Sequence, residues 1–264
     1  MTPTDRNALI KLGQSEEARV VIAKALDKAR QAEDTGDFVA GDFYDPAELT
    51  LLRSVFSLRT GGARLHGFGG YEQAERRRAV YSPTSRGPDA VHYRLAVIEV
   101  RLRDRHARLT HSAVLGAVMS QGIRREKMGD IVLADGIASV IVDESIADRV
   151  ALTSVGRDAV NCSVHDLSAL GHYASEHESQ TVTVASLRLD AVLAAAFNLS
   201  RSEAASSVEG GLVKINHVRE DGVSKKLKEG DLLSLRGSGR AKIALVAGET
   251  KKGRVRLEIE RPKP

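Results

Sequence analysis

The chain has 264 residues, of which 42% are hydrophobic, 28% charged and 4% aromatic, with a formal net charge of +4. The apolar fraction is that of a folded globular protein, and the single cysteine excludes an intramolecular disulfide and a cysteine-rich zinc module. Charged residues throughout the first twenty positions and the lack of long apolar runs favour a cytoplasmic protein that makes no membrane contact, and the absence of Trp argues against a base-stacking platform.

The first segment is predicted to be helical. Apolar residues recur with a helical period over residues 5–31, whereas residues 34–42 are acidic and contain glycine, which favours a loop. A second helix is expected to start with a capping box and a proline at the first helical position, at Asp45-Pro46-Ala47-Glu48. We therefore predict an all-helical N-terminal unit over residues 1–62.

Residues 63–180 are predicted to form an α+β domain. The expected elements are strands over 77–82 and 91–102, a helix capped by Thr110, a hairpin turning at Asp135-Gly136, a helix opening at Asp143 and a strand over 155–164. From strand 91–102 onward, this is the strand–helix–strand–strand–helix–strand order of ferredoxin-like and RNA-recognition-motif domains, and strand 77–82 is an extra strand in front of it.

A third domain is predicted over residues 181–264, after a polar linker at 176–180. A helical stripe of apolar residues starts near Leu187, and a capping box at Ser200 opens a second helix. Strands are then expected at 213–216, 232–236, 242–246 and 254–259.

Positive charge is concentrated in two segments. Residues 64–128 contain 13 Lys and Arg against 6 Asp and Glu, and residues 182–264 contain 16 against 10. Residues 129–181, between them, contain only 2 against 9. Clustered cations of this kind are typical of proteins that bind a polyanion, and arginine suits paired hydrogen bonds with phosphate. A genomic preference for arginine codons is an alternative explanation of the arginine excess, but it does not explain the segregation.

Four motifs of the third domain resemble the RNA-binding domain named after small-subunit ribosomal protein S-four. They are Leu187-Arg188-Leu189-Asp190, Leu199-Ser200-Arg201-Ser202, Val213-Lys214-Ile215-Asn216 and Gly230-Asp231. Further upstream, the chain is similar to the YlmH family of bacterial S-four-type RNA-binding proteins, in the segments Gly67 to Arg78, Leu109-Thr110-His111 and Gly122 to Ile131. The resemblance covers nearly the whole chain. Ser112 and Ala113 depart from the family pattern after His111, which puts in doubt an RNA contact by the arginine usual there.

The resemblance implies a fold and a function. The fold is α+β, with a helical N-terminal unit, an RNA-recognition-motif or ferredoxin-like middle domain and a C-terminal S-four-type domain. The function is that of a non-catalytic factor that docks on the large ribosomal subunit, has ribosomal RNA and peptidyl-tRNA as partners, and supports rescue or quality control of stalled translation. We expect a monomer without a metal or cofactor.

The residues expected to contact RNA lie in the two basic segments. A helix start with free N–H groups is a favourable place for phosphate, and neighbouring cations add to it. The candidate residues are Arg188, Arg201, Ser202, Lys214, Asn216, Lys225, Lys226, Lys228, Arg240, Arg76, Arg77, Arg78, Arg124, Arg125 and Lys127.

Other interpretations remain open. Arg188 and Asp190 could form an ordinary surface ion pair, and the basic run at 76–78 could be a charged edge strand. An RNA-modifying enzyme with a catalytic middle domain is one alternative function, although no set of nucleophile, base and oxyanion donors is recognisable. A protein-binding adaptor in cell-division regulation, using the acidic segment 129–181, is the other.

Overall fold

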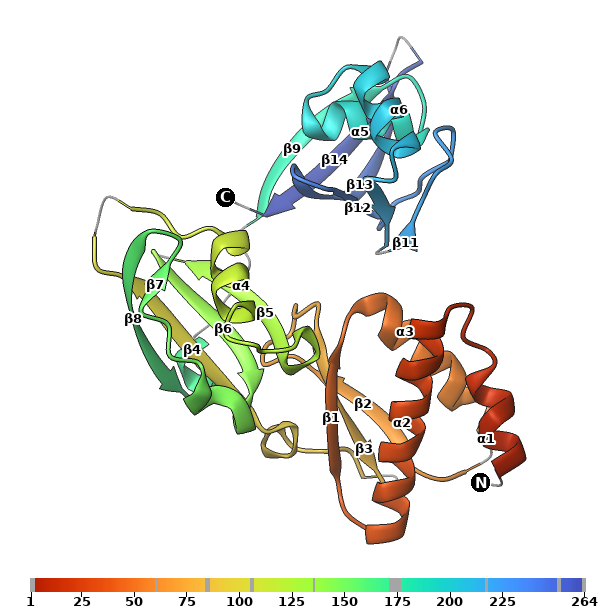
Figure 1. Ribbon diagram of the computed structural model, residues 1–264. Coiled ribbons are helices and arrows are strands. Elements are labelled where there is room, and N and C mark those ends of the chain that lie inside the picture. Colours follow the sequence, from red (N-terminus) through yellow and green to blue (C-terminus); the bar gives the residue numbers. More distant parts are fainter. Residues whose placement is uncertain are drawn as a thin grey trace. The chain divides into compact units, whose positions relative to one another are not determined.

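The chain folds into two compact units, Met1–Tyr173 and Ala174–Pro264, which are described separately (Figure 1). Both units combine helices with antiparallel sheet, which confirms the predicted α+β fold class. The computed structural model describes residues 3–59, 61–83, 86–104, 107–134, 136–170, 177–216, 218–250 and 253–262.

Three helices open the first unit, and the local sequence sets their ends. They are α1 (Pro3–Ile10), α2 (Glu16–Thr35) and α3 (Pro46–Ser57). Ser15 caps α2 by accepting a hydrogen bond from the Ala18 N–H, and Gly36 ends it with a φ of 72°, a conformation that glycine adopts without strain. Asp45 and Glu48 form the expected capping box at the start of α3.

A three-stranded sheet accompanies this helical region, so the N-terminal part is not all-helical as predicted. The strands, in the order β1-β3-β2, are β1 (Val39–Tyr44), β2 (Arg64–Phe68) and β3 (Arg77–Ser82). The prediction of a loop over residues 34–42 is wrong from Val39 onward, because Gly41 and Asp42 occupy a β-bulge within β1 and not a connection. The prediction that strand 77–82 precedes the middle sheet is also wrong, because this strand pairs with β1 and β2.

The middle part of the first unit contains a five-stranded antiparallel sheet in the order β5-β6-β4-β8-β7. Its strands are β4 (Leu95–Leu102), β5 (Met128–Ala134), β6 (Ile137–Asp143), β7 (Ser154–Val155) and β8 (Asp158–His165). Helical segments connect them or flank the sheet: η1 (Ala90–Tyr93), α4 (His111–Met119), η2 (Arg125–Lys127), η3 (Glu144–Arg149) and η4 (Leu167–Leu170), of which all but α4 are 3₁₀ turns.

The element order of this part confirms the expected RNA-recognition-like topology. The chain runs β4-α4-β5-β6-η3-β8, with β4 and β6 as the central strands of the four. Thr110 caps α4 as expected, and η3 takes the place of the second helix. Asp135, predicted at the hairpin turn, lies outside the described residues, and its neighbour Gly136 has a φ of 74°.

The middle sheet is buried on both faces at its centre. Ile98 and Val100 of β4 belong to the core beneath α4. Val97 and Ile141, which are 0% exposed, pack on the opposite face against Phe43 of β1 and Leu170 of η4. Because Phe43 comes from the N-terminal sheet, the two sheets of this unit share an apolar contact.

The second unit is a six-stranded antiparallel sheet in the order β11-β10-β12-β13-β14-β9, with two helices on one face (Figure 1). The elements are β9 (His177–Val184), α5 (Leu189–Phe197), α6 (Arg201–Glu209), β10 (Val213–Ile215), β11 (Val218–Arg219), β12 (Leu232–Leu235), β13 (Gly239–Glu249) and β14 (Val255–Pro262). Both helices contribute buried residues to one core with the strands, among them Leu193, Val208, Leu233, Ile243 and Leu257.

Strand β9 corrects the prediction of a polar linker at residues 176–180. From His177 onward the chain pairs with β14 in an unbroken register that ends at Val184↔Val255. The segment escaped prediction because an edge strand is held by backbone hydrogen bonds and tolerates polar side chains. Glu176 lies outside the described residues.

Candidate nucleic-acid interface

A buried carboxylate at the start of α5 gathers two arginines that are 13 residues apart in the sequence. Asp190 is only 6% exposed, and its Oδ1 and Oδ2 accept from Arg188 at 3.1 and 3.3 Å. Arg201, the first residue of α6, donates to Oδ2 at 2.5 Å. Burial raises the pKa of the Asp190 carboxyl, but the hydrogen bonds from Arg188 and Arg201 outweigh burial and lower it below its ordinary value. The carboxylate therefore stays ionised and fixes both guanidinium groups.

The start of α6 lies next to this pair. Ser200 accepts from the Glu203 N–H and Glu203 accepts from the Ser200 N–H, which is the predicted capping box. The hydroxyls of Ser200 and Ser202 are 3.0 Å apart. First-turn N–H groups have no partner within a helix and carry the positive end of its dipole, so this exposed end favours an anion.

A backbone contact adds two lysines to the arginine pair. The Leu189 N–H donates to the Lys225 carbonyl at 2.8 Å, and Arg188 forms an isolated β-bridge with Lys226. Lys225 and Lys226 are exposed. The structure thus brings together Arg188, Arg201, Ser202, Lys225 and Lys226, five residues that sequence reasoning had proposed from separate motifs.

Asn216 has a structural role at the turn after β10. Its φ is 50°, its Nδ2 donates to Asp231 Oδ1 at 2.9 Å, and its Oδ1 accepts from the Leu232 N–H at 2.9 Å. Asp231 is 5% exposed and also accepts from the Lys228 N–H. The amide of Asn216 therefore fixes the loop that carries Lys228.

Lys214 and Arg240 lie on the opposite face of the sheet from the two helices. Each is paired across β12 with Ser234, whereas the adjacent row of Ile215, Leu233 and Ala241 faces the core. Side chains alternate between faces along a strand, so Lys214 and Arg240 share the helix-free face. The structure therefore separates these two candidates from the group around Asp190.

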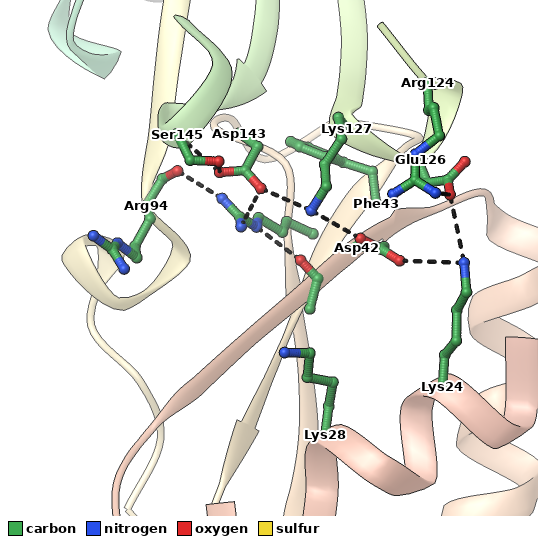
Figure 2. Close-up of polar contacts among 12 residues, drawn as sticks. Lys24, Lys28, Asp42, Phe43, Arg94, Arg124, Glu126, Lys127, Asp143 and Ser145 are labelled. Atoms are coloured by element: carbon green, nitrogen blue, oxygen red, sulfur yellow. Dashed lines mark hydrogen bonds and ion pairs between the residues drawn. The ribbon is translucent and has the colours of Figure 1, made fainter. Parts of the chain in front are cut away.

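Most candidates of the first unit are engaged in contacts within that unit, as Figure 2 shows for Lys127. Arg78 is 5% exposed, and its guanidinium donates to Asp143 Oδ2 at 2.6 Å and to the carbonyls of Arg94 and Gly41. Lys127 lies 3.1 Å from both Asp42 and Asp143. These contacts join the N-terminal sheet to the middle sheet, so Arg78 and Lys127 hold the unit together.

Arginines 76, 77 and 125 also face protein oxygens. Arg76 donates to the carbonyls of Met128 and Phe43, and Arg77 to those of Ala74 and Glu72. Arg125 donates to the Met128 and Gly129 carbonyls, and burial together with the nearby Arg76 lowers its pKa to about 10.

Arg124 differs from the other first-unit candidates in the exposure of its side chain. Its side chain is 67% exposed and lies 3.4 Å from Glu126, beside a second ion pair between Glu126 and Lys24 (Figure 2). Of the first-unit candidates, it has the exposure that an RNA contact requires.

Sequence reasoning missed Asp130, which organises the segment before β3. Its carboxylate accepts from the Tyr71 hydroxyl at 2.9 Å and from the N–H groups of Glu75 and Arg76 at 2.7 and 3.1 Å. An acidic residue at the start of an apolar strand was the available signal.

The apolar contact between the two sheets of the first unit covers one face of the middle sheet. It places Phe43 and η4 over the central strands, on the face that RNA-recognition motifs use for stacked bases.

Three family models match successive parts of the chain. "YlmH, N-terminal" matches residues 17–84, "Putative RNA-binding domain in YlmH" matches residues 88–169, and "S4 domain" matches residues 187–233. A relative from Bacillus subtilis (strain 168), "Ribosome-associated protein quality control protein P2", is 37% identical over 247 residues, which cover 93% of this chain and 95% of the relative. The chain belongs to the YlmH family.

The YlmH family models agree with the structural divisions. The N-terminal YlmH match extends to residue 84 and so includes all three strands of the first sheet, β3 among them. The S4-domain match contains Arg188, Arg201 and Lys225, whereas Arg240 lies beyond its end. A solved structure, "Cell division protein ylmH from Streptococcus pneumoniae", has a TM-score of 0.47 and 22% identity, covering 59% of this chain and 94% of that one.

The described residues of this YlmH-family chain contain neither a candidate metal-binding cluster nor a candidate membrane-spanning helix. No cluster of three or more His, Cys, Asp or Glu side chains there is arranged to hold a metal ion. No helix in the same residues combines the length and apolar character needed to cross a membrane.

Proposed function

We propose that this chain is a non-catalytic RNA-binding factor that docks on the large ribosomal subunit, contacts ribosomal RNA and tRNA, and acts as a monomer in cytoplasmic ribosome-associated quality control. The observation that carries the proposal is the group of Arg188, Arg201, Lys225 and Lys226 around the starts of α5 and α6. The name of the Bacillus subtilis relative supports the ribosomal context.

The mechanism is positioning by phosphate contacts. Arg188 and Arg201 are held by Asp190 while 44% and 56% of their side-chain surfaces stay exposed, so each can add a phosphate partner without losing its anchor. Backbone-directed contacts of this kind set register and orientation on RNA without reading its sequence. Arg124 supplies a separate phosphate contact from the first unit, and Lys214 and Arg240 supply contacts from the helix-free sheet face.

The test is cosedimentation of the full chain with purified large ribosomal subunits over a series of salt concentrations. Arg201→Ala is expected to weaken binding several-fold and to reduce the log–log salt slope by about one unit, because one phosphate contact is lost. Arg53→Ala is the matched control, since Arg53 is an exposed arginine of α3 far from these motifs in the sequence. An Arg201→Ala protein that sediments like the control would overturn this assignment of the interface.

Nuclease treatment separates this proposal from the adaptor alternative. Association that is lost when RNA is digested supports direct RNA binding. Association with a protein partner that survives digestion, at unchanged strength in Arg201→Ala, would contradict the proposal.

A further inference from the structure

An open groove of about 580 Å³ lies between the β10–β11 hairpin and the loop that precedes β12 in the second unit. Its aliphatic lining comes from Ile215, Val218 and Leu227. Leu227 is 2% exposed and belongs to the core, whereas Val218 is 61% exposed at the hairpin. The apolar surface that the groove offers to a partner therefore comes from Val218 and from the half-buried Ile215.

The rim of the groove is positively charged. Arg219 lies on the hairpin side, and Lys225, Lys226 and Lys228 lie on the loop side. Lys225 is paired with Glu220 at 3.8 Å, and Arg219 with Asp221 at 2.8 Å. Among the described residues, Lys226 and Lys228 have no carboxylate within ion-pair distance, so their charge is available to an anionic partner.

The polar groups at the end of the groove are already engaged. The Asn216 amide is bound at both Nδ2 and Oδ1, and the Asp231 carboxylate accepts from Asn216 and from the Lys228 N–H. These bonds fix the shape of the groove and leave it few directional groups with which to read a base. An occupant is therefore recognised by an apolar face and by flanking negative charges.

We infer that this groove receives a single unstacked nucleotide of a structured RNA, with its base against Val218 and Ile215 and its flanking phosphates at the rim lysines. A base within a continuous duplex is stacked and paired, so only an extruded nucleotide presents its face to such a floor. The inference rests on the proposed function, because it presupposes RNA binding by this unit. It adds that the preferred RNA has a bulged nucleotide and that the identity of the base matters little.

The test uses the full chain and two RNA hairpins that differ by one bulged 2-aminopurine. The wild type is expected to bind the bulged hairpin about five-fold more tightly than the fully paired one, from burial of part of one base face. The 2-aminopurine fluorescence should change on binding. Replacing the fluorophore position by each natural base should leave the preference within about two-fold, because nonpolar contact does not distinguish hydrogen-bonding edges.

Variants of the groove test whether the preference for the bulged hairpin arises there. Val218→Ser should abolish the preference for the bulge while the affinity for the paired hairpin is unchanged, because Val218 is exposed and its loss does not disturb the core. Leu245→Ser is the matched control, since Leu245 is a 41% exposed apolar residue on β13 outside the groove. The double variant Lys226→Ala/Lys228→Ala should weaken both hairpins to a similar degree.

The outcomes separate the two proposals. Equal wild-type affinity for both hairpins would overturn this inference and leave the proposed function intact. A bulge preference that survives Val218→Ser would also overturn this inference, and would favour an apolar peptide as the occupant of the groove. If the wild type bound neither hairpin, the proposed function itself would be refuted.

Discussion

Arg78 and Asp143 form a buried ion pair across 65 residues of sequence, with Nη2 and Oδ2 2.6 Å apart. Arg78 belongs to the N-terminal sheet, and Asp143 ends β6 of the middle sheet. The carboxylate also accepts from Lys127 and Ser145, and Lys127 reaches Asp42 as well (Figure 2). This network makes the relation between the two sheets depend on charge as well as on apolar contact.

Removing one partner of this pair should destabilise the first unit strongly. Arg78→Leu leaves the Asp143 carboxylate buried with a single cationic partner, and we expect a loss of about 3–5 kcal/mol in the free energy of unfolding. The change in the free energy of unfolding is measured by urea denaturation, with circular dichroism as the signal. The double variant Arg78→Leu/Asp143→Leu should recover much of the loss, because an apolar pair leaves no unpaired charge.

The control for this prediction is Arg101→Leu. Arg101 pairs with Glu99 at 2.8 Å, but its side chain is 54% exposed, so the loss should be below about 1 kcal/mol. Similar losses in Arg78→Leu and Arg101→Leu would contradict a special role for the buried pair.

The same carboxylate predicts a pH dependence of stability. Burial raises the pKa of Asp143, but Arg78, Ser145 and Lys127 outweigh it and lower the pKa below its ordinary value of 3.8. A lowered folded-state pKa gives stability that is fully present above the unfolded value and is lost as the pH falls through the folded one. Thermal melts from about pH 6 down to about pH 3 should therefore show the difference between wild type and Asp143→Asn shrinking as the pH falls. A difference that stays constant would exclude this titration.

Phe43 is a core residue at the contact between the two sheets, and its side chain should contribute strongly to the stability of the first unit. It is 1% exposed and packs against Val97 and Ile141 of the middle sheet. We expect Phe43→Ala to reduce the free energy of unfolding by about 3–5 kcal/mol. Phe38→Ala is the control and should cost clearly less, because the Phe38 ring is half-buried and has the tilted ring of His92 beside it.

Asp190 should promote RNA binding although it is an acid. Asp190→Asn removes a negative charge, which would raise the affinity if charge alone mattered. Because Asp190 immobilises Arg188 and Arg201, we expect the variant to bind RNA about five-fold more weakly in a filter-binding assay. Asp221→Asn removes the same charge from an exposed pair of the same unit and should bind RNA at least as well as the wild type. Tighter binding by Asp190→Asn would show that the carboxylate has no positioning role.

The features that could be predicted from the sequence are those determined locally. The two predicted capping boxes, at Asp45 and Ser200, depend on residues three apart, and the order of the middle strands follows from alternating apolar residues. Strand β1 was missed because its bulge at Gly41 and Asp42 has loop-forming residues, and β9 because its polar side chains suit an exposed edge.

The candidate site also has features that the local sequence indicates and others that depend on contacts between distant segments. The motifs around Arg188 and Arg201 were identifiable, but their connection through Asp190 depends on how α5 and α6 pack. Arg78 was expected at a surface because the sequence shows its charge and not its partner, which is 65 residues away. The groove beside Val218 could not be predicted, since its two sides come from segments that meet only in the folded unit.

The division of the chain into two units affects how the protein meets RNA in time as well as in space. Residues 1–173 contain 23 Lys and Arg against 23 Asp and Glu, a net charge of zero, whereas residues 174–264 contain 16 against 12, a net charge of +4. A distant polyanion experiences the net charge of a unit, so the second unit attracts it and the first does not. Long-range attraction sets the rate of encounter more than the lifetime of a complex. We therefore expect the second unit to make the first contact with RNA, and the exposed Arg124 of the first unit to act in the later steps of docking.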